Sequence, residues 1–406
     1  MKLFARSGDV IAQEVRAKHP HPRFRISPNG RLRTQRSSLS VPPTRSESCA
    51  SWVRSRPAAP ARRLEIPPLH CFRINTGGIV PDSADAVIPR RVHEAGRAQC
   101  SLPPFFFRLD EEELVIETQK KDGRRSEATF PAGELLISEG AQLGSAEIGL
   151  LANAGCSTVR VFRRPTVGVL STGDELVDLA ETEEGRAEVP EGKILDSNRP
   201  MLVELLQSRG FEVRNCGIVE DKWGKIRDHF AHCDVLVSSG GVSMGDKDLL
   251  KDVLQHDLRF DIHFGRVFMK PGLPSTFATG QLNAKKCVFF GLPGNPVSAF
   301  VSTHLFVLSM LRRRSGCSEE RSRGTTIKLK LGEDVRLDAR PEYVRAHFEA
   351  NVADLPAARI ISSNQVSSRL LSVTHANLLL ALPPRSDQTT ALKKGDVVDA
   401  IVIDWL

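Results

Sequence analysis

The sequence predicts an α/β protein built around a doubly wound parallel sheet, with an irregular, β-containing region before it and a small β domain after it. Two observations predict this architecture. Between residues 164 and 316, short apolar runs typical of buried strands alternate with segments typical of helices. After residue 324, several segments alternate apolar and polar residues with a period of two, as half-buried strands do. We therefore expect three domains, at 1–163, 164–316 and 324–406.

The elements follow from these patterns and from their end signals. In the central domain the expected strands are Thr166–Leu170, Phe211–Val219, Asp234–Val237 and Cys287–Phe290, and the expected helices are 198–210, Lys222–His232 and Val297–Arg313. Pro200 suits the first turn of a helix, and Gly210 suits its end. Outside this domain we expect one helix at Ser145–Ala154 and strands at Thr326–Leu331 and within Glu342–Glu349 and Val397–Ile403.

Composition excludes several classes of protein. The chain has 406 residues, of which 40% are hydrophobic, so it can bury a large core and is neither wholly disordered nor a coiled coil. The longest nearly apolar stretch, at 300–311, is too short to span a bilayer, and no apolar signal region opens the chain. The eight cysteines form no CxxC pair, which argues against a zinc ribbon or a disulfide scaffold. We expect a protein of the reducing cytosol.

The net charge of +7 is concentrated near the N-terminus. Residues 1–66 contain 14 Lys and Arg but only four acidic residues, so the remainder of the chain is slightly acidic. That remainder does not have the basic surface of a nucleic-acid-binding protein. The Arg/Ser/Pro-rich stretch at 19–68 lacks helical or strand periodicity and is expected to be disordered, although a mitochondrial presequence has a similar composition.

Three Gly-rich turns follow predicted strands of the central domain. They contain Ser171, Thr172 and Gly173; Ser239, Gly240, Gly241 and Ser243; and Pro293, Gly294 and Asn295. The carboxyl ends of parallel strands meet at one edge of the sheet, where ligands bind. Glycines let backbone amides approach an anion closely, although any single such turn could simply be tight. Together the three turns predict a site for a phosphate or a similar oxyanion.

Carboxylates and basic residues accompany these turns. Glu175, Asp221 and Asp248 fall near the same edge, and acids beside a phosphate site favour Mg²⁺, although an Asp there could also cap a helix. Arg266 and Lys270 lie two periods apart, which places them on the same side of a predicted strand. Residues 241–245 match GxSxG, the nucleophile elbow of serine hydrolases, but Ser239 and Gly240 separate the predicted strand from the motif, and Asp261–His263 is the only nearby acid–histidine pair.

Longer motifs resemble a known family. SSGGVSMGDKD (238–248), HFGRVFMKPGLPSTFAT (263–279) and GLPGNPVSAF (291–300) are similar to the molybdopterin molybdenumtransferase family, and most of all to the E domain of gephyrin. STGDEL (171–176), GKILDSNRPML (192–202), INTGG (74–78) and NQVSSRL (364–370) follow in the family's order. By this resemblance the central domain is a Mog-like, molybdopterin-binding domain.

The resemblance implies an activity and roles for individual residues. Family members insert molybdenum from molybdate into adenylylated molybdopterin and release AMP in a Mg²⁺-dependent step. The Gly-rich turns then hold the pyrophosphate, and Glu175, Asp221 and Asp248 hold Mg²⁺. Thr76 falls on a family threonine, Arg266 and Lys270 on two basic family positions, and Arg345 and Ser367 near the molybdate site.

The resemblance also implies partners. We expect a homodimer whose site uses both chains, and a separate molybdopterin adenylyltransferase, because only one such domain is present here. Neither nucleic acid nor a membrane span is expected. A gephyrin-like scaffold that clusters receptors through a cytoplasmic receptor loop is an alternative, but Arg164 stands where gephyrin has a contact aromatic.

The chain departs from the family in its N-terminal third. Residues 27–32 stand where an Asp-Gly-Tyr-Ala stretch is expected, so the family's catalytic aspartate has no counterpart. We interpret residues 19–71 as disordered or out of register with the family, and we attribute this stretch and residues 89–133 to translation out of frame or mis-splicing. A catalytically impaired relative is therefore a further alternative.

Overall fold

The computed structural model describes residues 8–19, 130–179, 189–219, 227–241, 252–351, 355–361 and 364–405, together with the backbone of residues 224–226 and of six short strands between residues 31 and 116. Contacts divide the chain into two compact units. The first comprises residues 1–4, 14–138 and 145–159, and the second comprises residues 5–13, 139–144 and 160–406. The residues predicted to be disordered or out of register at 19–71 and 89–133 lie almost entirely outside the described residues.

The described residues of the first unit form short strands and one helix. Strand β1 (Val15–Arg16) pairs with β8 (Leu135–Ile137) in antiparallel orientation, and α1 spans Ser145–Asn153, where a helix was predicted. The remaining strands are β2 (Arg31–Thr34), β3 (Trp52–Val53), β4 (Cys71–Phe72), β5 (Ala86–Pro89), β6 (Phe105–Leu109) and β7 (Glu112–Ile116). Strands β2 to β5 form a sheet in the order β3-β4-β2-β5, and β6 pairs with β7.

A six-stranded sheet organises the second unit. Its order is β12-β9-β13-β16-β15-β14, with the strands β9 (Thr166–Thr172), β12 (Glu212–Val219), β13 (Val235–Ser239), β14 (Asp261–Phe264), β15 (Thr276–Leu282) and β16 (Lys285–Leu292). Strands β12, β9, β13 and β16 are parallel, as predicted. Strands β15 and β14 continue the sheet in antiparallel orientation. Because β9 lies between β12 and β13, the chain crosses over within the sheet, as a doubly wound fold requires.

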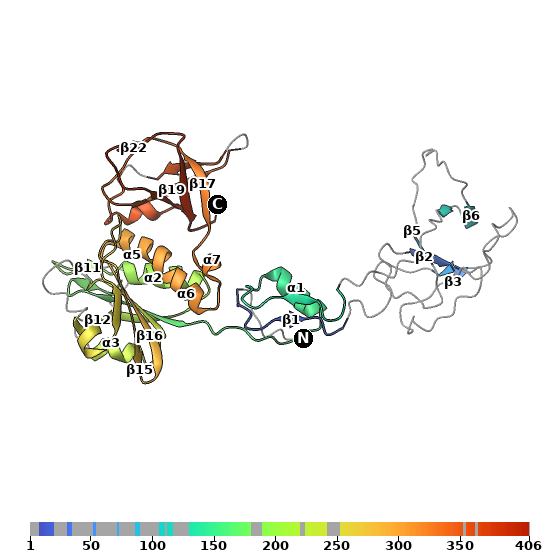
Figure 1. Cartoon of the computed structure of the whole chain (residues 1–406), viewed down its shortest axis with the longest axis horizontal. Coiled ribbons are helices and arrows are strands. Elements are labelled where there is room, and N and C mark those ends of the chain that lie inside the picture. Colours follow the sequence, from blue (N-terminus) through green and yellow to red (C-terminus); the bar gives the residue numbers. More distant parts are fainter. Residues whose placement is uncertain are drawn as a thin grey trace. The chain divides into compact units, whose positions relative to one another are not determined.

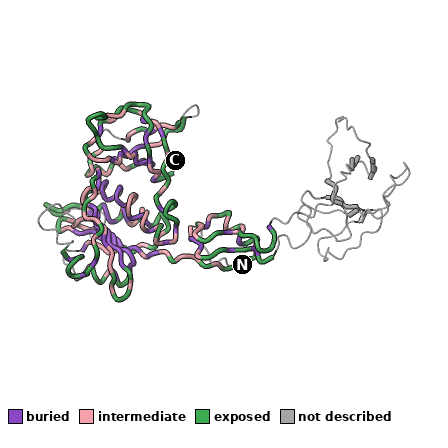
Figure 2. Tube along the Cα trace, viewed as in Figure 1, coloured by how far each residue is buried: buried purple, intermediate pink, exposed green. Residues whose placement is uncertain are grey.

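Helices cover both faces of this sheet (Figure 1). The helical elements are α2 (Asn198–Ser208), α3 (Gly224–His229), η4 (Val253–Asp257), α5 (Pro296–Ser302), η5 (Thr303–Val307), α6 (Leu308–Arg314) and α7 (Glu319–Ser322). On β13, Val235 and Val237 pack with α2, α5 and α6, whereas Leu236 packs with η4 on the other face. Both side-chain directions of each central strand are therefore buried, which explains the uninterrupted apolar runs and the concentration of buried residues visible in Figure 2.

The C-terminal domain is a closed five-stranded barrel in the order β17-β20-β19-β21-β23. Its strands are β17 (Thr326–Leu331), β19 (Glu342–Glu349), β20 (Ala357–Ile360), β21 (Leu378–Leu382) and β23 (Val397–Val402). Small pairs complete the second unit: β10 (Leu176–Val177) with β11 (Ile194–Leu195), and β18 (Val335–Arg336) with β22 (Ala391–Leu392). A 3₁₀ turn, η6 (Leu370–Val373), precedes β21. Among the described residues, no helix combines the length and the apolarity that crossing a bilayer requires.

One predicted element is wrong. The segment from Arg266 to Lys270 is irregular rather than a strand, and only Lys270 forms a bridge, to Glu342 of the barrel. The Lys270 N–H donates to the Pro341 carbonyl at 2.9 Å, and the Tyr343 N–H donates to the Lys270 carbonyl at 2.7 Å. The barrel thus satisfies the backbone of Lys270, which the local sequence pattern could not reveal.

Substitution of Phe289 by Ala should remove a large part of the core between β16 and η4. Phe289 is fully buried, and Phe→Ala changes at such sites cost about 3–5 kcal/mol. Urea unfolding should therefore show a lower midpoint at an unchanged slope. Phe268→Ala is the matched control, because this side chain is 67% exposed and should change stability little. Equal effects of the two substitutions would contradict the assigned core.

Candidate functional site

The three Gly-rich turns begin at the same level of the central sheet. Ser171 of β9 pairs with Ser239 of β13, and Ser239 pairs with Leu292 of β16. The Gly240 N–H donates to the Leu292 carbonyl at 3.0 Å, which joins the second turn to the third. The structure therefore brings the three predicted turns together at one edge of the sheet.

The second turn presses against the first at Gly240. Its φ of +89° lies in the left-handed region, and a Cβ there would lie 2.3 Å from the Thr172 carbonyl oxygen. Only glycine fits this position, because both the conformation and the backbone contact exclude a side chain. In the first turn, a Cβ at Gly173 would meet the Glu175 carboxylate, with the nearest oxygen at 2.5 Å. The glycines thus permit close packing of the turns and keep side chains away from their backbone.

The start of α2 ties all three turns together. The Asn198 Nδ2 donates to Ser239 Oγ and to the Gly294 carbonyl, both at 2.7 Å. The Ser171 hydroxyl donates to Asp196 Oδ1 at 3.0 Å. Asp196 and Asn198 were not among the predicted site residues. The run of polar residues at 196–199, at a helix start in the middle of apolar strands, is the signal that could have revealed them.

A buried arginine anchors this junction. The Arg199 side chain is only 5% exposed, and its Nε donates to Asp196 Oδ2 at 2.9 Å. One terminal nitrogen donates to Asn215 Oδ1 at 2.6 Å, and the other pairs with Asp178. Because a buried charge is tolerated only when it is paired and hydrogen-bonded, this network fixes the start of α2 against β9 and β12. We call Asp178, Asp196, Asn198, Arg199 and Asn215 the α2 network.

Polar atoms without partners remain beside the turns. Among the described residues, Thr172 Oγ1, Asn198 Oδ1, Ser238 Oγ and Thr276 Oγ1 are buried and have no hydrogen-bond partner. Ser238 and Thr276 both pair in register with Gly291, next to the end of β16. Leaving such groups unsatisfied is costly, so the edge retains hydrogen-bonding capacity that suits a polar ligand.

Lys270 lies between the central domain and the barrel. Its Nζ is 3.1 Å from Glu342 Oε1 and 3.2 Å from Asp338 Oδ2. Burial lowers the pKa of Lys270, but the hydrogen bonds and charges of the two carboxylates outweigh it and raise the pKa above its ordinary value. An ammonium group has three N–H donors, so the two carboxylates leave one donor for a further acceptor.

Asp338 is held ionised at this contact. Burial acts to raise its pKa, but hydrogen bonds from Arg340 and Lys270 lower it to about 2. Arg340 Nε donates to Asp338 Oδ1 at 3.2 Å. The sequence pointed to neither Asp338 nor Glu342, because their pairing with Lys270 arises from the barrel's position beside the central domain.

Arg345 and Ser367 belong to the barrel side of this region. The Arg345 side chain is fully buried, and its guanidinium donates to Ser372 Oγ at 3.1 Å and to the Tyr343 carbonyl at 3.4 Å. Desolvation lowers the pKa of Arg345 to about 10. The Val297 N–H, which follows the third Gly-rich turn, donates to the Ser367 carbonyl at 3.1 Å. The backbone of Ser367 is therefore bonded to the edge of the central sheet that carries the Gly-rich turns. Arg345 instead bonds within the barrel, to Ser372 and Tyr343.

Some of the remaining predicted site residues lie in the described part of the chain and some do not. Among the described ones, Arg266 and Glu175 are exposed, and Gly241, Pro293 and Asn295 lie in the turns already described. Thr76, Asp221, Ser243 and Asp248 lie outside the described residues. Within the described part of the chain, no group of three His, Cys, Asp or Glu side chains is placed to hold a metal ion.

Three family models match the chain in succession. Residues 1–155 match the MoeA N-terminal region (domain I and II), residues 168–313 match a probable molybdopterin binding domain, and residues 328–403 match the MoeA C-terminal region (domain IV). The chain is 36% identical over 348 residues to the molybdenum cofactor synthesis protein cinnamon of Drosophila melanogaster, covering 82% of this chain and 53% of that protein.

Other relatives extend this pattern. Gephyrin of Dictyostelium discoideum is 30% identical, covering 98% of this chain and 58% of that protein. A molybdopterin molybdenumtransferase of Nostoc sp. is 28% identical, covering 94% of this chain and 84% of that protein. The chain thus spans little more than half the length of cinnamon and gephyrin. The crystal structure of a molybdopterin biosynthesis moeA protein from Pyrococcus horikoshii OT3 shares the fold, with a TM-score of 0.71 and 21% identity over 99% of this chain and 93% of that one.

Loss of the Arg199 charge should destabilise the fold strongly. Arg199→Met leaves the buried carboxylate of Asp196 without its cation, which costs about 3–5 kcal/mol. The double variant R199M/D196N should recover at least about 1 kcal/mol, because the amide keeps the acceptor for Ser171 without the charge. Urea titrations of the two variants measure this coupling. Arg323→Met, which breaks an exposed pair with Glu319, should cost less than about 1 kcal/mol. Additive effects at positions 196 and 199 would contradict the proposed network.

Asp338 should stabilise the folded state above pH 4. Its folded pKa of about 2 lies below the ordinary value, so the stabilisation is present when the carboxylate is ionised and is lost as pH falls from 4 towards 2. Asp338→Asn should lower stability at pH 7 by about 1 kcal/mol after allowance for solvent screening, and the difference should shrink towards pH 2. Denaturant unfolding at pH 7, 4 and 2.5 measures this, with Asp399→Asn, an exposed pair, as the control. A pH-independent difference would argue against an ionic role.

Proposed function

Because this chain belongs to the MoeA family, we propose that it is a molybdopterin molybdenumtransferase, which inserts molybdenum from molybdate into adenylylated molybdopterin and releases AMP. The observation that carries this proposal is the edge of the central sheet. Three Gly-rich turns begin there in register, and the α2 network holds them together. The edge combines backbone exposed by glycine with polar groups that still lack partners.

The Gly-rich turns suit the pyrophosphate of the adenylylated pterin. A pyrophosphate presents many acceptor oxygens, and backbone N–H groups are donors that carry no competing negative charge. Ser171 and Ser239 are already committed to Asp196 and Asn198, so they fix the turns. In this proposal the backbone amides of Gly173, Gly241 and Gly294 supply the contacts with the ligand, while the Gly240 amide joins the second turn to the third.

Mg²⁺ belongs to the proposal through Glu175, Asp221 and Asp248. Of these three carboxylates, only Glu175 lies in the described part of the chain, and it is exposed beside Gly173. An exposed oxygen ligand beside a phosphate-binding turn fits a hard cation. When bound, Mg²⁺ neutralises negative charge on the pyrophosphate and on the departing AMP.

Molybdate requires donors to a tetrahedral dianion, which we assign to the contact between the central domain and the barrel. Lys270 is fixed there by Asp338 and Glu342 and retains one N–H donor. Arg266 is exposed nearby in sequence and supplies a second cation. Arg345, fully buried, acts by positioning Ser372 and the segment that carries Ser367.

The expected partners follow from the same proposal. We infer a homodimer in the cytosol, which receives adenylylated molybdopterin from a separate molybdopterin adenylyltransferase. The described structure contains one molybdopterin-binding domain, at residues 168–313, so the adenylylating step requires another protein or another part of a longer chain.

The receptor-clustering alternative gains no support from Arg164. Its guanidinium pairs with Asp9 at 3.0 Å and donates to the Gly210 carbonyl. This side chain therefore connects residues of its own unit, where gephyrin presents an aromatic for receptor contact. We do not propose the receptor role as a second function.

The direct test supplies the purified chain with adenylylated molybdopterin, molybdate and Mg²⁺ and measures both AMP release and reconstitution of a molybdenum-free apoenzyme. Molybdate-dependent AMP release together with reconstitution supports the proposal. Binding of the adenylylated pterin without either product would indicate the impaired relative, in agreement with the missing N-terminal aspartate. Failure to bind the pterin would contradict the assigned site.

Asp221 and Asp248 should be essential for AMP release in a Mg²⁺-dependent manner. Asn keeps the size of the side chain but removes the charge that binds a hard cation, so each Asp→Asn change should reduce AMP release roughly a hundredfold. High Mg²⁺ should partly restore it. Asp261→Asn, an exposed residue of β14, is the control and should leave the rate unchanged. If the two residues only cap helices, Asn caps equally well, and the rate would be unaffected and insensitive to Mg²⁺.

A further inference from the structure

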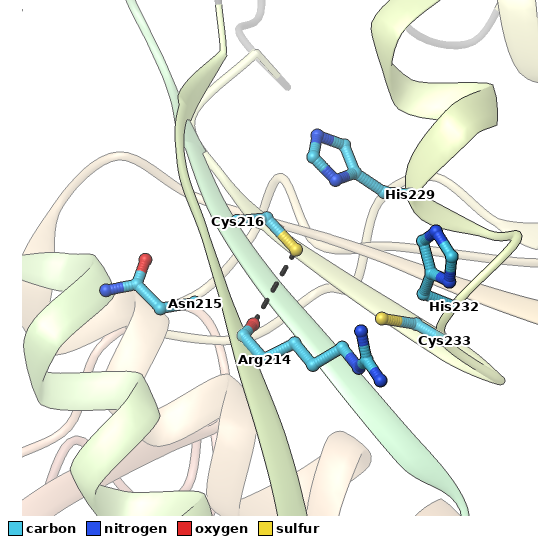
Figure 3. Close-up of a pocket in the computed structure, with 6 residues that line it drawn as sticks. All are labelled: Arg214, Asn215, Cys216, His229, His232 and Cys233. Atoms are coloured by element: carbon cyan, nitrogen blue, oxygen red, sulfur yellow. Dashed lines mark hydrogen bonds between the residues drawn. The ribbon is translucent and has the colours of Figure 1, made fainter.

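A cluster of cysteine and histidine side chains lines a cavity away from the Gly-rich turns. A cavity of about 430 Å³ is lined by Arg214, Asn215, Cys216, His229, His232 and Cys233 (Figure 3). Cys216 lies on β12, and Cys233 lies between α3 and the start of β13. Since β13 is parallel to β9 and β16, its start is at the opposite end of the sheet from the turns. The function proposed above uses neither cysteine.

The two thiols share one small space over β9. Gly168 stands between β12 and β13, and a Cβ added to it would lie 2.9 Å from Cys233 Sγ and 3.1 Å from Cys216 Sγ. Both sulfurs therefore occupy the volume that a side chain at residue 168 would fill. Figure 3 shows both thiols on the same side of β12, with Asn215 directed to the other side. Because β9 separates β12 from β13, the missing side chain at Gly168 is what allows the two thiols to meet.

The two thiols differ in character. The hydrogen bond from Cys233 lowers the pKa of Cys216, against the effect of its partial burial, and the charge of Arg214 lowers it further. The same hydrogen bond and burial raise the pKa of Cys233. Cys216 is half-buried, whereas Cys233 is 1% exposed. Cys216 is therefore the thiol that ionises first and reacts with an oxidant. Cys233 is the buried second thiol beside it.

We propose that Cys216 and Cys233 are a redox-active dithiol that a hydroperoxide converts into an intramolecular disulfide. The Cys216 thiolate attacks one peroxide oxygen, the O–O bond breaks, and hydroxide leaves, which gives a sulfenic acid on Cys216. Cys233 gives its proton to the hydroxide, forming water, and its thiolate then attacks the Cys216 sulfur. The S–O bond breaks, and the sulfenic hydroxyl leaves as a second water after protonation by solvent. Two thiols and one hydroperoxide thus yield one disulfide and, for hydrogen peroxide, two waters.

A metal site is the rival interpretation of this cluster. Two Cys and two His are a common zinc-binding set. However, the described residues, which include all four of these side chains, contain no group of three such ligands placed to hold a metal ion. The two thiols meet over Gly168 with β9 between their strands, so a disulfide requires β12 and the segment before β13 to move towards each other.

The test treats the full chain with one equivalent of hydrogen peroxide, blocks the remaining thiols with N-ethylmaleimide and digests the protein with trypsin without reduction. Cleavage after Arg214, Lys222 and Arg227 separates the two cysteines, so only a disulfide can join peptides 215–222 and 228–247. We expect that joined peptide, its loss on reduction, and at least a tenfold fall in labelling of Cys216. Cys156, which is also half-buried but has no adjacent thiol in the described structure, should keep its labelling and serves as the internal control.

Two variants separate the roles of the cysteines. In Cys233→Ser, Cys216 should be oxidised to a sulfenic acid that dimedone traps, with no joined peptide. In Cys216→Ser, Cys233 should react at least tenfold more slowly than Cys216 does in the unmodified chain. The proposal is overturned if the unmodified chain forms no joined peptide, or if Cys216 is oxidised no faster than Cys156. The peptide map of the unmodified chain decides by itself whether the disulfide forms. The outcome therefore does not depend on whether either variant folds.

Discussion

The buried charge of Arg199 is the constraint on which the candidate site depends. A guanidinium that is 5% exposed must be neutralised, and Asp196 and Asp178 do so while Asn215 accepts a further hydrogen bond. This requirement fixes the first turn of α2 at the edge of the sheet. Since Asn198 and Asp196 lie in the same turn, they are fixed as well, and through them the three Gly-rich turns. The apolar face of α2 supports this arrangement through Leu202 and Leu206, both fully buried against β9 and β13.

The charges at the contact with the barrel set what a ligand there can gain. Lys270 and Arg340 face the carboxylates of Asp338 and Glu342, so these four charges already neutralise one another before any anion arrives. A dianion is therefore attracted only if further donors act with Lys270, such as the exposed Arg266 or the hydroxyl of Ser367. Arg345 does not provide an open donor, because it is fully buried and its nitrogens already donate to Ser372 and Tyr343. Its burial instead makes the barrel wall behind the edge rigid.

The sequence predicted the elements that depend on local patterns. The apolar runs at Thr166–Leu170 and Cys287–Phe290 became β9 and β16, and the helix expected at 198–210 became α2. The common level of the three turns followed from the geometry of parallel strands. Contacts between distant segments could not be predicted in the same way. Arg266–Lys270 resembles a strand in its pattern, but only Lys270 bonds to the barrel backbone, and the partners of Lys270 lie about 70 residues away in the chain. The α2 network and the paired thiols are likewise products of tertiary packing.

Strand β12 connects the two features that the sequence did not reveal. Successive side chains of a strand point to opposite faces, so Asn215 reaches Arg199 on the face covered by α2, while Cys216 meets Cys233 on the face covered by α3. Gly168 of β9 is required for the second contact, because any side chain there would displace both sulfurs. The same residue of β9 lies between Val167 and Val169, which pack against α2. One pair of neighbouring strands therefore supports the candidate ligand edge on one face and holds the dithiol on the other, so a bond formed between the cysteines acts on the backbone that also carries Asn215.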